Sequence, residues 1–344
     1  MERKVFGQDG KGNTVEKVII ANSKGMRAEV CTLGAALVSL FVKDKNGEER
    51  DIVLGYDNPA DYLKHTTYFG ATVGRNGNRI RDGKFTLNGT EYVLEKNDGE
   101  NNLHSGANGL SNKEWEIEKE AENSVTLSCV SKDLEQGFPG NMTVKVTYTV
   151  GEENDLSIDY EAVSDKDTVA NFTNHSYFNL GGHDSGTMVN QKLKLFSSKF
   201  TPVDGTLIPT GEMRDVKNTP MDFTDFKVIG KEIDAKDEQL KFGGGYDHNF
   251  IVDGEGFRIM AEALCEDTGI HMKAYTDAPA VQFYAGNFIG DQVGKGGAAY
   301  KDRHGFCLES QYCPDAVNNS AFASPILKSG ETYRTRTVYQ FSID

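Results

Sequence analysis

Polar and ionisable side chains gather in five segments that are rich in glycine and asparagine. The segments are 74–80, 101–106, 171–180, 244–250 and 305–311. Connecting segments on a rigid β scaffold are where binding groups usually converge. Their Arg, Asn and His side chains can donate to hydroxyl groups, and their Asp and Glu side chains can accept from them. The set therefore predicts a site for an uncharged, polyhydroxylated ligand, for which a monosaccharide is the natural candidate.

Two of these residues could move protons at the anomeric carbon of a sugar. That chemistry needs a carboxylate-like base and an imidazole-like acid within reach of two oxygens on one carbon. Glu309 and His175 could supply the pair. Each also has a structural interpretation. His175 could be a hydrogen-bonded histidine of a polar strand, and Glu309 could be solvated, because period two places it opposite Phe306 and Leu308.

Three further side chains could hold such a ligand. His104, Arg79 and Asp247 all lie in the five segments. Arg79 could equally bridge two loops, and Asp247 could close a glycine-rich turn. Taken singly, each of the three is compatible with a structural role.

No cofactor motif accompanies these residues. The sequence has no H-E-x-x-H motif, no Cys/His spacing typical of a metal site and no P-loop. Residues 294–299 match G-x-G-x-x-A, but the pattern follows no parallel strand and precedes no amphipathic helix. We therefore expect no cofactor and no metal.

Alternation with a period of two indicates the elements that must position the site. It is clearest over residues 143–150, 156–163 and 333–341, each of which has one apolar face. Residues 85–94 contain Asn88-Gly89, which predicts a hairpin with a type I′ turn. Only residues 58–63 and 231–240 could form short helices. The chain should be all-β, because helices are too few for a βαβ architecture.

Length and composition indicate one large globular domain over residues 1–344. Charged residues make up 26% and hydrophobic ones 38% of 344 residues, and no linker-like segment interrupts the strands. Sheets of this extent must stack to hide their apolar faces and edges. We expect a large antiparallel β-sandwich.

Charge and cysteine usage limit the partners and the compartment. A formal net charge of −15 argues against nucleic acid and anionic membranes. No window resembles a signal peptide or a membrane span, and the five cysteines form no C-x-x-C pair. We expect a cytoplasmic protein that binds a free monosaccharide, as a monomer or a weak homodimer.

In order along the chain, the motifs resemble those of the aldose 1-epimerase (galactose mutarotase) family. The motifs are Asn78-Arg79-Ile80, Asn102–Gly106, Thr173–Leu180, Tyr246–Asn249, Val281–Phe288, and Gly305–Gln311 with Pro314-Asp315. The resemblance implies one β-sandwich domain with very large sheets and an open cleft for a free hexose. It implies interconversion of the α and β anomers of sugars such as galactose and glucose, by ring opening and reclosure.

The resemblance also implies roles for individual residues. Glu309 would be the general base that removes the C1 hydroxyl proton, and His175 the general acid that protonates the ring oxygen. Other residues would hold the sugar: Arg79, His104 and Asp247, with Asn78 and Gln282 as weaker candidates. No arginine cluster that could clamp a phosphate appears around Arg79, which favours an unphosphorylated sugar.

The protonation states of the pair lead to a further expectation. An ordinary glutamate is ionised at pH 7 whereas an ordinary histidine is mostly neutral. Nearby carboxylates, Asp247 among them, should therefore raise the pKa of His175 if the imidazolium is the acid. Two other functions stay open: a sugar-binding protein without chemistry, and a glycoside hydrolase with Asp247 and Glu309 as its two carboxylates.

Overall fold

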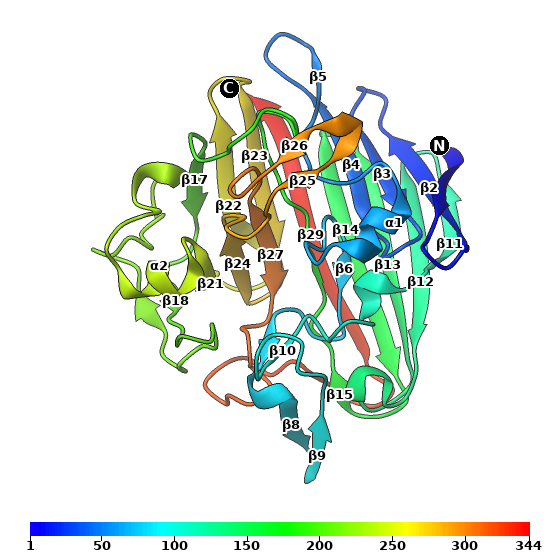
Figure 1. Ribbon diagram of the computed structural model, residues 1–344, viewed down its shortest axis with the longest axis vertical. Coiled ribbons are helices and arrows are strands. Elements are labelled where there is room, and N and C mark those ends of the chain that lie inside the picture. The colour runs from blue at the N-terminus through cyan, green and yellow to red at the C-terminus, as the bar shows by residue number, and fades with distance from the viewer.

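The largest element of the fold is a nine-stranded sheet in which every neighbouring pair is antiparallel (Figure 1). A computed structural model describes residues 1–344. In spatial order the strands are β11 (Glu116–Ala121), β12 (Ser124–Ser131), β13 (Met142–Gly151), β14 (Asp155–Ser164), β29 (Thr332–Ile343), β23 (Ile270–Thr276), β22 (Arg258–Cys265), β17 (Lys192–Leu195) and β20 (Lys227–Val228). The last strand of the chain, β29, thus joins the two halves of this sheet.

Two five-stranded antiparallel sheets complete the main framework. The first is β1 (Glu2–Gln8), β2 (Thr14–Ala21), β3 (Arg27–Cys31), β4 (Leu37–Lys43) and β5 (Glu49–Asp51). The second, in spatial order, is β19 (Arg214–Asp215), β18 (Lys199–Thr201), β21 (Asp247–Ile251), β24 (Ala280–Tyr284) and β27 (Cys307–Gln311).

Five short two-stranded ribbons lie outside these three sheets. They are β6 (Thr72–Val73) with β16 (Thr173–Asn174), β7 (Arg79–Ile80) with β10 (Asn102–Leu103), β8 (Lys84–Leu87) with β9 (Thr90–Val93), β15 (Thr168–Val169) with β28 (Ile326–Leu327), and β25 (Gln292–Val293) with β26 (Ala299–Tyr300). The first two ribbons lie next to residues predicted for the site.

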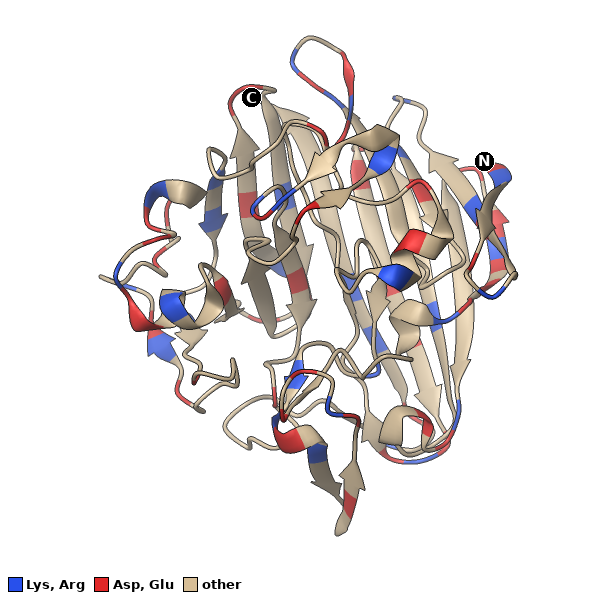
Figure 2. Ribbon diagram, in the orientation of Figure 1, with Lys and Arg blue, Asp and Glu red and all other residues tan.

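The core lies between the sheets. Along β13, Val144, Val146, Tyr148 and Val150 are buried on one face, whereas the alternate residues are partly or fully exposed. One cluster of 57 buried residues combines this face with side chains from both five-stranded sheets. The predicted all-β, antiparallel sandwich is therefore observed. Acidic and basic residues are interspersed over the loops and strands (Figure 2).

The predicted strands and hairpin are present. Strands β13, β14 and β29 cover the three segments with the clearest alternation. Strands β8 and β9 form the predicted hairpin, in which Asn88 and Gly89 have φ of 51° and 80°. Both values are positive, as a type I′ turn requires.

The two helices are short. Helix α1 (Pro59–Lys64) follows Asn58, whose side chain accepts from the Asp61 N–H, and the prediction for 58–63 is confirmed. The prediction for 231–240 is wrong at its start, because α2 spans Glu238–Gly243. Asp237 caps α2 by accepting from two backbone N–H groups, and an aspartate cap begins a helix at the residue that follows it. Neither helix has the length or apolar character needed to span a membrane.

Candidate functional site

His175 lies directly after β16, on a backbone that is buried and fully hydrogen-bonded. Its N–H donates to the Ala71 carbonyl at 2.9 Å, and its carbonyl accepts from the Gly70 N–H at 3.0 Å. The preceding Asn174 adds a side-chain bond to the Gly70 carbonyl at 2.8 Å. These bonds fix the backbone from which the His175 side chain projects, and that side chain is only 6% exposed.

Glu309 projects from β27 toward the same imidazole. Its Oε2 lies 3.6 Å from Nε2 of His175, and this oxygen has no hydrogen-bond partner. Glu309 is 2% exposed, so the interpretation of Glu309 as a solvated residue is wrong. Neighbouring elements bury both faces of β27, which is why alternation alone did not reveal its environment.

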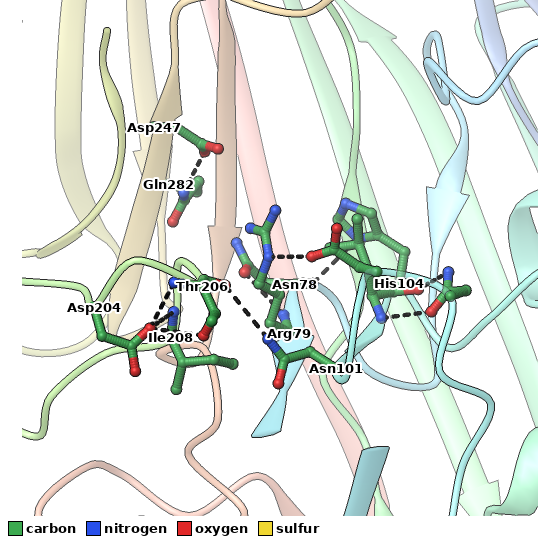
Figure 3. A network of polar contacts seen from close by, with 12 residues as sticks. Asn78, Arg79, Asn101, His104, Asp204, Thr206, Ile208, Asp247 and Gln282 are labelled. Atoms are coloured by element: carbon green, nitrogen blue, oxygen red, sulfur yellow. Dashed lines mark hydrogen bonds and ion pairs between the residues drawn. The ribbon is translucent and has the colours of Figure 1, made fainter. Parts of the chain in front are cut away.

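The ribbon of β7 and β10 brings Arg79 and His104 to the site, as Figure 3 shows. Asn78 and His104 have φ of 64° and 53°, in the left-handed region. The Asn78 N–H donates to Nδ1 of His104 at 3.1 Å, so neutral His104 carries its proton on Nε2. Arg79 donates from Nε to Asp98 at 2.7 Å, which means that it also bridges loops, as its structural interpretation predicts.

Asp247 and Gln282 come from the neighbouring strands β21 and β24. Nε2 of Gln282 donates to Oδ1 of Asp247 at 2.7 Å (Figure 3). Asp247 begins β21 rather than forming a turn of its own. The strand register places Gln282 opposite Glu309, and the side-chain hydrogen bond joins Gln282 to Asp247.

One pocket of about 200 Å³ joins these side chains. Six of the seven predicted site residues line it: Asn78, Arg79, His104, His175, Asp247 and Glu309. The seventh, Gln282, does not line the pocket, and its side chain donates a hydrogen bond to Asp247, which does.

The remaining wall of the pocket is largely aromatic, and its tyrosine and phenylalanine side chains are not among the predicted site residues. Tyr177 stacks on the imidazole of His175 at 5.1 Å between ring centroids, and Tyr68 stacks at 5.8 Å. Tyr284 and Phe288 also line the pocket. Tyr177 could have been found from its spacing, because it lies two residues from His175. Tyr68 lies outside all five polar segments and gave no comparable signal.

Burial dominates the electrostatics of the pocket. It raises the pKa of Glu309 well above its usual value, and the charge of Asp247 adds to this whereas Arg79 opposes it. Burial lowers the pKa of His175 to about 4, although the nearby polar backbone of His175 itself opposes the change. The pKa of His104 falls well below its usual value for the same reason, with the His175 charge adding to the effect.

The expectation that carboxylates raise the pKa of His175 is therefore wrong. Desolvation of the imidazolium outweighs the neighbouring acids, and burial also raises the pKa values of Asp247 and Glu309. When the pair of His175 and Glu309 holds a single proton, these opposite shifts favour the carboxyl group of Glu309 over the imidazole.

Three of these residues are close enough to share a metal ion. His104, His175 and Glu309 each offer one atom within 4.8 Å of the others, and all three are buried. Such a donor set would suit a divalent transition ion. The expectation of a metal-free site stays a prediction, which a chelator can test.

Comparison with known proteins relates this site to one family. The family model described as aldose 1-epimerase matches residues 16–340. The chain is 40% identical to galactose mutarotase from Bos taurus, over 99% of this chain and 98% of that protein. It is 36% identical to aldose 1-epimerase from Escherichia coli, over 96% of each chain.

Solved structures agree with this relation. The crystal structure of a GalM/aldose epimerase homologue from C. elegans superposes with a TM-score of 0.87 at 32% identity, covering 95% of this chain and 98% of that one. Galactose 1-epimerase from Lactobacillus acidophilus gives the same TM-score at 27% identity, over 99% of this chain and 98% of that one.

Proposed function

The chain belongs to the aldose 1-epimerase family, and we propose that its His175–Glu309 pair interconverts the α and β anomers of free hexoses such as galactose and glucose. The protein is an aldose 1-epimerase, and hence an isomerase. The observation that carries the assignment of the pair is its geometry. A buried imidazole nitrogen and a buried carboxylate oxygen without a partner lie 3.6 Å apart at one pocket.

The reaction moves one proton on and one proton off the sugar. The Glu309 carboxylate takes the proton of the C1 hydroxyl, O1 becomes the aldehyde oxygen, and the C1–O5 bond breaks. O5 keeps the electron pair of that bond and receives a proton from Nε2 of the His175 imidazolium. Rotation about C1–C2 and the reverse step then close the ring on the other face, with the two residues exchanging roles.

Only one proton is shared by the pair in this cycle. Burial raises the pKa of Glu309 and lowers that of His175, so without sugar the shared proton favours Glu309 over His175. Sugar hydroxyls that donate to the orphan oxygen of Glu309 favour its carboxylate form, and the proton can then reside on Nε2 of His175. Binding of the substrate thereby prepares the reactive arrangement.

The remaining polar groups would hold the sugar. Arg79 and His104 offer N–H donors and Asp247 offers an acceptor on the lining of the pocket. Asn78 and Gln282 would act mainly through the residues they contact, because Asn78 orients His104 and Gln282 orients Asp247.

The size and charge of the pocket support a small, unphosphorylated sugar. Its volume of about 200 Å³ lies below the roughly 300–1,000 Å³ of pockets for drug-sized ligands. Arg79 is already paired with Asp98, while Asp247 and Glu309 line the same pocket. A phosphate group there would face acidic side chains without a free arginine.

The same proposal covers organisation and compartment. One hydrophobic cluster runs from Val18 to Phe341, which supports a single domain over residues 1–344. We propose that the protein acts as a monomer or a weak homodimer, because this chain alone supplies the acid, the base and the sugar-binding groups of the pocket. All five cysteines are free thiols, which supports a reducing compartment such as the cytoplasm.

Polarimetry tests the proposed function directly. Freshly dissolved α-D-galactose and α-D-glucose should relax to their anomer mixtures faster with the protein than without it. Anomer-resolved NMR with a panel of aldoses would rank the substrates. Sugar binding without acceleration would identify a binding protein instead, and release of monosaccharide from a disaccharide would identify a hydrolase.

A further inference from the structure

A buried thiol lies against the side of His175 that faces away from Glu309. Sγ of Cys307 is 3.5 Å from Nδ1 of His175, and Cys307 has no exposed surface. Cys307 does not line the pocket and so cannot touch a sugar in it. Its one polar contact with the pocket is the one to His175, while its packing contacts are with the cluster that contains Tyr177 and Tyr284.

The pleat of β27 explains why one strand reaches both nitrogens of the ring. Cys307 and Glu309 are two residues apart in β27, and residues at this spacing point to the same face of a strand. Cys307 meets Nδ1 and Glu309 approaches Nε2. The imidazole thus lies between two side chains of a single strand.

The proposed cycle requires a particular proton on this ring. Nε2 gives its proton to O5 and takes it back on reclosure, so Nδ1 must keep its own proton throughout. Neutral histidine can carry its proton on either nitrogen, and the partner of one nitrogen decides the form. A partner of Nδ1 that accepts a hydrogen bond stabilises the form that leaves Nε2 free to react.

We propose that Cys307 is a positioning residue whose sulfur accepts the hydrogen bond of Nδ1–H and thereby keeps Nε2 of His175 as the proton-transferring atom. The inference rests on the proposed role of His175. The backbone carbonyl of His175 is the competing acceptor, with one of its two lone pairs already used by the Gly70 N–H at 3.0 Å.

A thiol suits this position better than a carboxylate would. Burial raises the pKa of Cys307 well above its usual value, so the sulfur stays protonated and uncharged. An uncharged, weak acceptor orients the imidazole and stabilises the imidazolium less than a carboxylate would. His175 therefore remains a strong acid when protonated, as transfer to a weakly basic ring oxygen requires.

Substitutions that separate hydrogen bonding from packing test the proposal. Cys307→Ala removes the acceptor, Cys307→Val removes it while filling the space, and Cys307→Ser restores it. We expect kcat to fall about three- to tenfold in the Ala and Val variants with KM unchanged, and to recover in the Ser variant. Cys129→Ala, which changes a buried thiol in β12, is the matched control.

Nitrogen-15 NMR of the histidine rings supplies the second measurement. In the parent protein Nδ1 of neutral His175 should be protonated, and in Cys307→Ala the proton should be redistributed toward Nε2. An unprotonated Nδ1 in the parent overturns the proposal without any variant having to fold. Parent-like kcat in the Ala and Val variants overturns it as well, as does a Ser variant no better than Val. If the parent does not accelerate mutarotation, the proposed function fails, whereas the NMR result still decides the role of Cys307.

Discussion

When the sugar-free protein is acidified, His175 should stay neutral far below the pH at which an exposed histidine becomes charged. Burial lowers the pKa of His175 from 6.5 to about 4. Each pH unit of that difference corresponds to about 1.4 kcal/mol, so protonation of the ring is disfavoured by roughly 3 kcal/mol relative to water. A histidine-selective NMR titration of the sugar-free protein should therefore show a midpoint near 4, and the His175→Asn variant identifies the resonance.

The same proton couples to stability. Between pH 6.5 and about 4 the unfolded chain binds a proton at His175 that the folded chain does not, so the free energy of unfolding falls as the pH falls. Urea unfolding at several pH values should show this slope. In His175→Asn the slope should be smaller by about 1.36 kcal/mol per pH unit. His248, whose pKa burial also lowers to about 4, keeps contributing in both proteins and serves as the internal comparison.

The pH profile of kcat/KM follows from the shared proton. As the pH rises, the pair of His175 and Glu309 first loses the proton of His175, at a pKa near 4. It loses the remaining proton at the raised pKa of Glu309. The rate should therefore rise with pH through the histidine and fall through the carboxyl group, the reverse of their ordinary order. An NMR midpoint for His175 at or above 6.5, with an acidic limb of kcat/KM near that value, would refute the reasoning.

Glu309→Gln should lower kcat, measured by polarimetry, at least about a hundredfold, because the variant lacks the base. It should also raise the melting temperature at pH 8, because an amide avoids the cost of ionising a buried group. Near-parental mutarotation in a folded variant would move the search for the base to Asp247. Arg79→Ala and Asp247→Ala should each lower kcat/KM about ten- to a hundredfold through lost charge-assisted hydrogen bonds, and unchanged constants would return these residues to structural roles. A chelator should leave the rate unchanged, whereas loss that only a divalent ion reverses would show that the cluster of His104, His175 and Glu309 holds a metal. Asp237→Ala should cost about 0.5–2 kcal/mol in urea unfolding through the lost cap of α2, and a parental midpoint would contradict that role.

Local patterns were sufficient to predict the strands of the large sheet. Residues 143–150, 156–163 and 333–341 alternate because one face of each strand meets the core and the other meets solvent. The start of α2 was not predicted, because Asp237 rather than apolar periodicity determines it. The order of the strands was not predictable from local patterns either, because the pairing of β29 with β14 and β23 joins segments that are distant in the sequence.

The residues of the candidate site were predictable, but their burial and their effect on one another's pKa values were not. The motifs containing His104, His175 and Glu309 are contiguous strings, and the pocket brings the three side chains together. The direction of the pKa change at His175 was not predictable, because it depends on burial by segments far away in the chain. Tyr68 was not predicted as a site residue for a similar reason, because only the fold places its ring against His175.

The position of β29 has a consequence for how the protein is made in the cell. Residues 332–343 are synthesised after every other strand, yet they lie at the centre of the nine-stranded sheet. While the chain is still growing, β14 and β23 each lack the neighbour that pairs with them, and both present open edges. The complete sheet can therefore close only once translation has passed residue 343. Until then the nascent chain depends on protection from edge-to-edge association, and truncation before β29 should give aggregation rather than a smaller active enzyme.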